Sequence, residues 1–127
     1  MKLFGIDNDN IEYVKNSSQL LSHIGEKLPI AVIHPGCGWC QKTVVESFDP
    51  ICRGLKEKGQ KCYLINGTSE EGEMVLNDLN TEVHGFPNTK LCDVKLDDEK
   101  QPYLDCTQIK GWKERSFFED AFKKFGL

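Results

Sequence analysis

The fold is decided by residues 29–48, which read PIAVIHPGCGWCQKTVVESF. Residues 29–34 form a nearly continuous run of apolar β-formers, the pattern of a strand buried on both faces of a sheet. After a short glycine-containing turn, apolar residues recur every three to four positions as far as Leu55, which predicts one face of a long helix. Pro50 lies off that face, so we expect it to kink the helix rather than end it. The segment therefore predicts a central strand, a turn and a helix.

Short β-type runs alternate with helical patterns on both sides of this segment. Strands are expected at residues 11–14, 29–34, 62–66, 89–96 and 103–109, and the remaining helices are expected to begin at Ser17 or Ser18, at Ser69 and at the capping box Ser116-Phe117-Phe118-Glu119. The resulting order is β-α-β-α-β-α-β-β-α, an α/β fold with a mixed central β-sheet flanked by helices. Strands joined through helices pair in parallel, whereas the last two strands form an antiparallel hairpin.

Length and charge limit the kinds of protein that this chain can be. Its 127 residues fit one domain, which we place at residues 11–127, with residues 1–10 as an N-terminal extension. The net charge of −4 argues against nucleic acid or an anionic membrane as a partner, because both attract basic patches. No apolar run approaches the ~20 residues of a membrane span, and residues 1–10 lack the apolar core of a signal peptide. We expect a monomer located in the cytoplasm.

The chain contains six cysteines, of which only Cys37 and Cys40 are close together in sequence. The others lie within apolar patterns, where a free cysteine behaves as a small hydrophobic residue, so we expect buried thiols. These are Cys52, Cys62, Cys92 and Cys106. One pair leaves two possibilities open. A hairpin centred on Glu99 would place Cys92 opposite Cys106, where they could form a structural disulfide or pack as two thiols.

The spacing Cys37-Gly38-Trp39-Cys40 suits disulfide exchange, which needs one sulfur to attack and a second to release the mixed disulfide. Two intervening residues place the sulfurs about one helical turn apart. Cys37 should lie at the helix N-terminus, where free N–H groups and the helix dipole favour a thiolate, so we assign it as the nucleophile. Cys40, one turn further in, is the resolving cysteine. Half of a zinc site, an iron–sulfur ligand pair or an inert disulfide are the alternatives. No second closely spaced pair supports a metal, and we expect none.

At this point the chain resembles the thioredoxin superfamily. The likeness rests on the cysteine motif after the second strand and on Gly85-Phe86-Pro87, about fifty residues later. Gly111, before the last helix, matches a common glycine of the superfamily. The resemblance implies a thioredoxin fold and a cis peptide bond before Pro87, packed beside the cysteine pair. The alternative is an ordinary trans proline that opens an edge strand.

The resemblance also implies a function. We expect a thiol–disulfide oxidoreductase that acts on protein disulfides and is recycled by a reductase or an oxidase, with no cofactor beyond its own Cys37–Cys40 disulfide. An extended substrate would pair with the backbone at Phe86-Pro87, as in β-augmentation, while Gly38 and Trp39 contact it from the motif. We favour a reductant. The alternatives are a disulfide oxidase or isomerase, and a non-catalytic module that binds proteins through the same face.

Two departures from the superfamily pattern concern the chemistry. Gly36 replaces the aromatic residue that usually precedes the first cysteine, and Trp39 is the candidate to supply that apolar surface. Ala31 stands where the superfamily often has a buried carboxylate that takes the proton from the resolving thiol. Either water or another group must take that proton here. His34 is a candidate, because a neutral imidazole can accept a proton near pH 7; the alternative is a partly exposed histidine at a strand end without this role.

Overall fold

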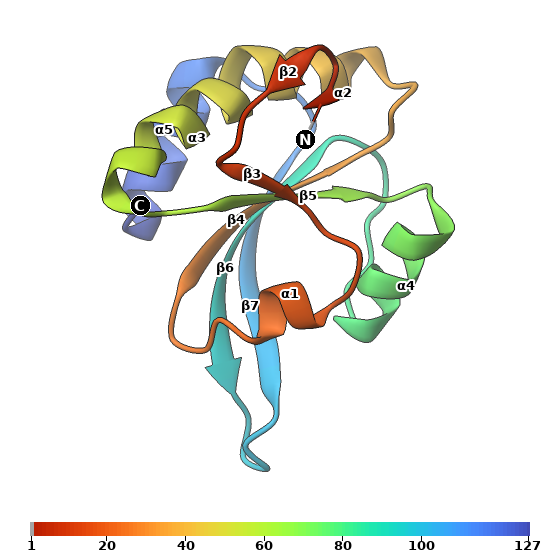
Figure 1. Cartoon of the computed structure of the whole chain (residues 1–127), viewed down its shortest axis with the longest axis vertical. Helices are drawn as coiled ribbons and strands as arrows, with labels where there is room; N and C mark the ends of the chain where they lie inside the picture. Colours follow the sequence, from red (N-terminus) through yellow and green to blue (C-terminus); the bar gives the residue numbers. More distant parts are fainter. Residues whose placement is uncertain (1) are drawn as a thin grey trace.

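The computed structural model describes residues 2–127 and consists of a five-stranded mixed sheet between two layers of helices (Figure 1). In spatial order the strands are β3 (Ile11–Tyr13), β5 (Cys62–Asn66), β4 (Lys27–Ile33), β6 (Asn88–Leu96) and β7 (Pro102–Lys110). β3, β5 and β4 run parallel, whereas β6 is antiparallel to β4 and β7 is antiparallel to β6. The expected α/β class with a mixed central sheet is confirmed.

The helices cover the two faces of the sheet in different groups. They are α1 (Ser18–Leu21), α2 (Gly38–Thr43), the π-helical turn η1 (Val44–Phe48), α3 (Asp49–Leu55), the 3₁₀ turn η2 (Lys56–Lys58), α4 (Glu70–Asp78) and α5 (Arg115–Phe125). Helices α2, α3 and α5 lie on one side of the sheet, and α1 and α4 on the other (Figure 1). The β6–β7 hairpin extends beyond both layers.

Strand β4 is central because nearly all of its side chains are apolar. Successive side chains of a strand point to opposite faces, so each face needs its own apolar residues. Ala31 and Ile33 join the core cluster under α2, α3 and α5, while Ile30 and Val32 join the cluster under α1 and α4. All four side chains are buried. Packing on both faces fixes the position of β4, and the end of β4 in turn fixes the position of the turn that carries the cysteine motif.

The helix that follows the motif continues across Pro50, as the sequence predicted. Pro50 lies in the first turn of α3, directly after the π-helical turn η1. Proline has no N–H to donate, and its ring crowds the carbonyl group four residues earlier. Widening of the preceding turn accommodates that ring, because a π-turn breaks the regular hydrogen-bond ladder at this place.

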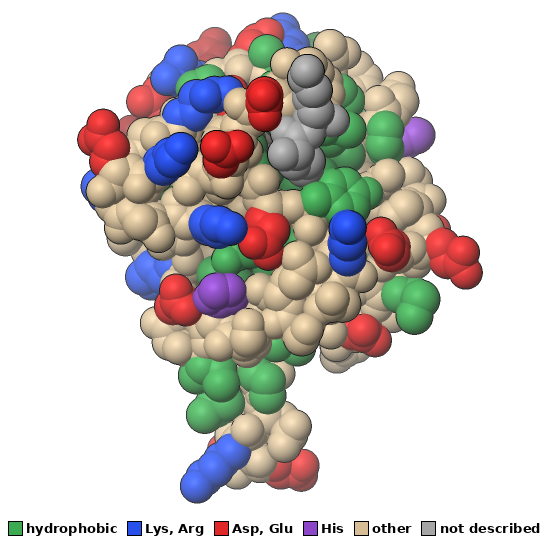
Figure 2. Space-filling view, viewed as in Figure 1, with side chains coloured by type: hydrophobic (Ala, Val, Ile, Leu, Met, Phe, Trp, Pro, Cys, Tyr) green, Lys and Arg blue, Asp and Glu red, His purple; other side chains and the backbone are tan. Residues whose placement is uncertain are grey.

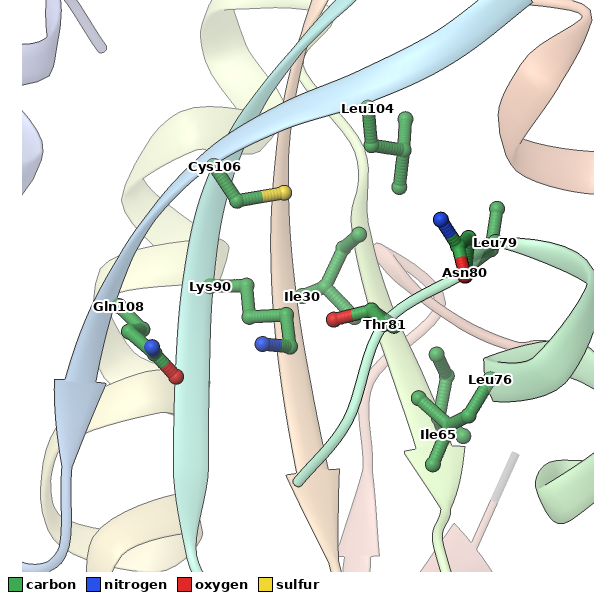
Figure 3. Close-up of a pocket in the computed structure, with 10 residues that line it drawn as sticks. All are labelled: Ile30, Ile65, Leu76, Leu79, Asn80, Thr81, Lys90, Leu104, Cys106 and Gln108. Atoms are coloured by element: carbon green, nitrogen blue, oxygen red, sulfur yellow. The ribbon is translucent and has the colours of Figure 1, made fainter. Parts of the chain in front are cut away.

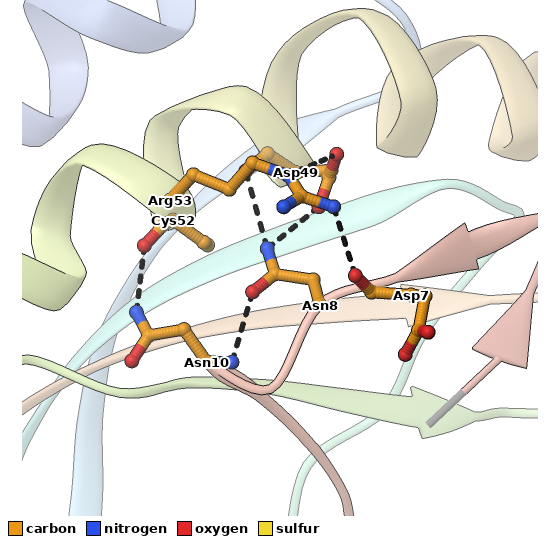
Figure 4. Close-up of polar contacts among 6 residues, drawn as sticks. All are labelled: Asp7, Asn8, Asn10, Asp49, Cys52 and Arg53. Carbon is orange, nitrogen blue, oxygen red and sulfur yellow. Dashed lines mark hydrogen bonds and ion pairs between the residues drawn. The ribbon is translucent and has the colours of Figure 1, made fainter.

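Residues 2–10, which we expected to be an extension, pack against the domain. They form a hairpin of β1 (Lys2–Leu3) and β2 (Ile6–Asp7), followed by a polar segment that is tied to α3 (Figure 4). The Nδ2 of Asn8 donates to the Asp49 carboxylate over 2.6 Å. The Nδ2 of Asn10 donates to the backbone carbonyls of Cys52 and Gln60 over 2.6 and 2.7 Å. Buried polar groups with such partners fix the segment in place.

The prediction of buried thiols is wrong at Cys52 and Cys62, whereas at Cys92 and Cys106 the structure has the disulfide, one of the two possibilities left open. Cys52 on α3 and Cys62 on β5 form one disulfide, and Cys92 and Cys106 form another across β6 and β7. The expected hairpin register holds, with Cys92 directly opposite Cys106 and their Cα atoms 4.1 Å apart. Cys52, Cys62 and Cys92 are buried and Cys106 is exposed. An apolar sequence pattern could not distinguish a thiol from a half-cystine, because both sulfurs suit an apolar site.

Two of the expected helix starts are right and one is wrong. The Ser69 hydroxyl accepts a hydrogen bond from the Gly72 N–H and caps α4, and α1 begins at Ser18. The expected capping box at Ser116 does not form. Helix α5 begins at Arg115, and the backbone carbonyl of Glu114 accepts from the first free amides. The sequence pattern predicted helix α5 correctly, but it placed the start of the helix a residue or two too late.

The surface carries mixed charge. Figure 2 shows acidic and basic side chains interspersed over one face of the molecule. Among residues 2–127, no helix combines the length and the apolar character needed to cross a bilayer. Within the same residues, no three His, Cys, Asp or Glu side chains gather in the manner of a metal site.

Candidate active site

Cys37 is the N-cap of the helix that begins with α2. Strand β4 ends at Ile33, a short turn follows, and the helix starts directly after Cys37. The Cys40 N–H donates to the Cys37 sulfur over 3.2 Å, so sulfur takes the capping position that a serine or aspartate oxygen usually occupies. A negative charge is stabilised there by the free amides and the helix dipole. Cys37 is a free thiol and partly exposed to solvent, so a substrate can reach it.

Cys40 is a free thiol that lies one turn further along the helix and is completely buried. Burial raises the pKa of Cys40 to about 12, with further contributions from the hydrogen bond and the charge of Cys37. The two cysteines therefore differ in the way that disulfide exchange requires. Cys37 faces solvent at the helix N-cap, while Cys40 is buried and its raised pKa keeps its proton in place near neutral pH.

The loop opposite Cys37 contains a cis peptide bond between Phe86 and Pro87. Gly85 adopts a φ of +96°, a backbone conformation that glycine adopts readily and residues with a Cβ atom do not. The Gly111 N–H donates to the Pro87 carbonyl over 2.9 Å and anchors the loop to the end of β7. The Phe86 carbonyl lies 3.9 Å from the Cys37 sulfur. Within residues 2–127, neither Gly85 nor Phe86 makes a backbone–backbone hydrogen bond, and the Phe86 carbonyl accepts only from the Cys37 thiol. The Gly85 carbonyl and the N–H groups of Gly85 and Phe86 are therefore free beside Cys37.

Gly67 provides the space that the Phe86 ring occupies. A Cβ atom at Gly67 would lie 2.4 Å from Cε1 of Phe86, which is far inside van der Waals contact. The Gly67 N–H donates to the Ile33 carbonyl and thereby links this position to the end of β4. Sequence analysis missed Gly67, since a glycine after a strand is usually only a turn residue.

Trp39 is 58% exposed and belongs to an aromatic patch beside the cysteine motif. Its ring centroid lies 5.9 Å from that of Trp112, which follows β7. The Lys42 ammonium lies 4.5 Å from the Trp112 ring centroid and 5.4 Å from that of Trp39. We call these three residues the aromatic patch. Sequence analysis found only Trp39, although Lys42 lies three residues on along the helix, a spacing that brings side chains together.

His34 lies at the end of β4 and is exposed. Its Nδ1 accepts a hydrogen bond from the Gly36 N–H over 3.2 Å, and its ring meets that of Phe86 edge to face, with centroids 6.1 Å apart. Within residues 2–127, the imidazole makes no hydrogen bond to Cys40. Ala31 is buried in the same core cluster as Cys40. The His34 imidazole thus lies beside the Phe86 loop, while a backbone hydrogen bond of His34 to Cys40 opposes the rise in the pKa of that thiol.

Comparison with known proteins identifies the architecture. No protein-family model and no curated protein matches the chain. Thioredoxin f from spinach chloroplast matches with a TM-score of 0.64 at 11% identity, over 92% of this chain and 94% of that one. Thioredoxin O2 from Arabidopsis thaliana in the oxidized state has a TM-score of 0.60 at 13% identity, over 91% and 93% of the two chains. Fasciola hepatica thioredoxin has a TM-score of 0.63 at 10% identity, over 90% and 98%. This chain has the thioredoxin fold.

Proposed function

We propose that this thioredoxin-fold chain is a thiol–disulfide oxidoreductase that exchanges disulfides with protein substrates through Cys37 and Cys40. The observation that carries the proposal is the pairing of a solvent-reachable thiol at a helix N-cap with a buried thiol one turn inside. A structural disulfide has no need of a reachable thiol. A binding module has no need of the second cysteine. The complete pair lies in one chain, so a monomer suffices.

Exchange proceeds in two displacements. The Cys37 thiolate attacks one sulfur of a substrate disulfide, and the other substrate sulfur leaves with the electron pair of the broken bond. Cys40 then loses its proton and attacks the Cys37 sulfur, which releases the second substrate sulfur as a thiolate. The substrate disulfide is reduced by two electrons, and the Cys37–Cys40 pair is oxidised to a disulfide. Oxidation of a substrate dithiol is the same sequence in reverse.

The substrate is held by its main chain and by the aromatic patch. The free Gly85 carbonyl and the free N–H groups of Gly85 and Phe86 lie beside Cys37 and suit an extended segment that adds along this edge. The Phe86 carbonyl becomes free as well once the Cys37 thiol gives up the proton that it donates there. Such pairing makes little demand on substrate sequence. The exposed Trp39 ring adds an apolar contact, and Gly38, without a side chain, leaves the approach to Cys37 open. This arrangement fits an unfolded or flexible protein segment that carries a disulfide.

The proton of Cys40 has no carboxylate acceptor along the strand that precedes it, because residues 29–40 contain neither Asp nor Glu. Water that enters with the substrate is the acceptor that we favour. His34 stays a second candidate only if its ring turns away from Gly36, to which its Nδ1 is bonded. The deprotonation step then depends on the hydroxide concentration, which makes resolution slow at neutral pH.

Two further disulfides bear on the compartment in which the protein acts. Disulfides persist in oxidising environments and are rare in the cytosol, where thiols are kept reduced. Cys52–Cys62 and Cys92–Cys106 therefore favour an oxidising compartment over the cytoplasm that the sequence led us to expect. In such a compartment, the Cys37–Cys40 pair would serve as an oxidase or isomerase. A thiol count on denatured, unreduced protein from its natural source tests this. Two free thiols, or none if Cys37 and Cys40 are also bonded, would support an oxidising compartment. Six free thiols would instead support the reductant that the sequence led us to expect.

Reduction of insulin by dithiothreitol is the direct test of activity, because it needs no knowledge of the natural substrate. We expect the wild-type chain to accelerate precipitation of the insulin B chain and Cys37→Ser to abolish the effect. Cys40→Ser should retain attack but accumulate a mixed disulfide. Lys58→Ser, at an exposed turn away from the motif, is the control for folding. Equal activity of wild type and Cys37→Ser, or activity in neither, would favour the non-catalytic binding module.

A further inference from the structure

Lys90 is a lysine in the middle of the sheet, and the proposed redox chemistry does not use it. It lies on β6 opposite Ile30 of β4 and Gln108 of β7, and only 5% of its surface is exposed. Within residues 2–127, its ammonium makes no ion pair and no side-chain hydrogen bond. Lys90 Nζ is not among the fully enclosed polar atoms without a partner, so the ammonium keeps some contact with solvent. Its hydration is reduced without a protein partner in exchange, which is costly for a charged group.

The Lys90 side chain lines a cavity of about 220 Å³ on the α4 side of the sheet. Figure 3 shows it extending from β6 towards Ile30 and Thr81. The wall is mixed, with aliphatic side chains along one part of it and polar groups along the rest, and the polar groups are neutral apart from the ammonium. The aliphatic lining residues are Ile30, Ile65, Leu76, Leu79 and Leu104, the neutral polar ones are Asn80, Thr81 and Gln108, and the half-cystine Cys106 completes the wall.

This combination selects one class of ligand. A single cation without a protein partner favours an anion, and hydrogen bonds to a charged group are stronger than those between neutral groups. The leucine and isoleucine side chains favour a hydrocarbon chain. A cavity of about 220 Å³ has room for several heavy atoms, since one water occupies about 30 Å³ of liquid. We propose that this cavity binds a small organic carboxylate with a short hydrocarbon chain, whose carboxylate pairs with Lys90.

Two features of the surroundings support a preformed site. The Cys92–Cys106 disulfide joins β6 to β7 two rows of residues from Lys90 and Gln108, so the two strands that carry these side chains are fixed to each other. Burial, and secondly the like charge of Lys110, lower the pKa of Lys90. A bound carboxylate would supply the missing partner charge and relieve this penalty.

The cavity is separate from the redox pair. Its apolar walls belong to the core cluster under α1 and α4, whereas Cys40 belongs to the cluster on the opposite side of the sheet. A ligand bound at Lys90 therefore leaves the Cys37 sulfur free, and the two sites can be tested independently.

Titration of the full chain with hexanoate, followed by backbone amide NMR, tests the proposal. We expect saturable shifts at the amides of Thr81, Lys90 and Leu104, and a dissociation constant about tenfold or more weaker for hexanamide, which has the same chain without the charge. Lys90→Met keeps the side-chain length and should weaken hexanoate to the level of hexanamide. Lys15→Met, at an exposed position, is the charge-matched control and should bind like the wild type.

The comparison of the two ligands on the wild-type protein does not depend on any variant, so it decides the matter even if Lys90→Met folds poorly. Equal affinity for hexanoate and hexanamide would overturn the proposal, because it would mean that Lys90 recognises no charge. Shifts at residues remote from the cavity, or no saturable shift for either ligand, would also overturn it.

Discussion

The resolving step of disulfide exchange should accelerate steeply with pH. Burial is the largest cause of the raised pKa of Cys40, which is about 12 in the dithiol. At pH 7 a thiol with that pKa is ionised to only about one part in 10⁵, and the ionised fraction grows about tenfold with each pH unit. Only the thiolate attacks, so the rate of attack by Cys40 should follow that fraction.

Formation of the mixed disulfide lowers the pKa of Cys40, but the resolving rate should still rise with pH. Cys37 loses its charge when it bonds to the substrate, so the part of the rise in pKa that comes from Cys37 disappears. The contribution of burial stays. We therefore expect the resolving rate to rise about 100-fold between about pH 7 and pH 9 without a plateau. A thiol with the ordinary pKa of about 8.5 would begin to level off within that range.

Stopped-flow reaction with an aromatic disulfide whose thiolate is coloured separates the two steps. The first release of colour, from attack by Cys37, depends on the concentrations of both reactants. The second release, from attack by Cys40, does not depend on them. Cys40→Ser should keep the first phase and lose the second. A second phase that is independent of pH, or that levels off well below pH 9, would refute the reasoning that burial controls Cys40.

Three other predictions concern stability, measured by urea unfolding. Asn10→Ala should lower the free energy of unfolding by roughly 1–3 kcal/mol, because two backbone carbonyls lose their donor, and no loss would mean that residues 2–10 are not docked. Replacement of both Cys92 and Cys106 by serine should cost about 3 kcal/mol, from the chain entropy of a loop with a sequence separation of 14; an unchanged midpoint would show that the bridge does not form. Lys90→Met should raise stability at pH 7 by roughly 1–3 kcal/mol. Because the folded-state pKa of Lys90 is lowered from 10.5, the unfolded wild type binds more protons in the window up to about pH 10, so wild-type stability should rise with pH there. Lys90→Met should lack that rise. An equal rise in the wild type and the variant would contradict the assignment of the rise to Lys90.

The sequence predicted the sheet and the cysteine motif because both leave local signals. The continuous apolar run of β4 and the period-2 pattern of β6 and β7 are properties of single strands. The hairpin register followed from the position of Glu99, since pairing on both sides of a turn is fixed by its centre. The strand–turn–motif–helix arrangement around Cys37 likewise depends on neighbouring residues only.

The rest of the site depends on contacts between distant segments, which leave no local signal. Gly67 matters because the Phe86 ring lies where its Cβ would be, and Trp112 matters because its ring lies beside Trp39. The Cys52–Cys62 bridge joins a helix to a strand, and only the packing of α3 on β5 brings the sulfurs together. Lys90 was missed for a related reason, because an alternating strand pattern does not show which lysine lies on the covered face.

Disulfide mapping by mass spectrometry after one turnover with a protein disulfide tests the central claim most directly. Starting from protein in which only Cys37 and Cys40 are reduced, we predict that turnover forms a Cys37–Cys40 bond and leaves Cys52–Cys62 and Cys92–Cys106 as they were. In Cys40→Ser, the substrate should be found attached to Cys37. A new bond that involves any other cysteine, or a Cys37 thiol that stays unmodified while the substrate is reduced, would contradict the account.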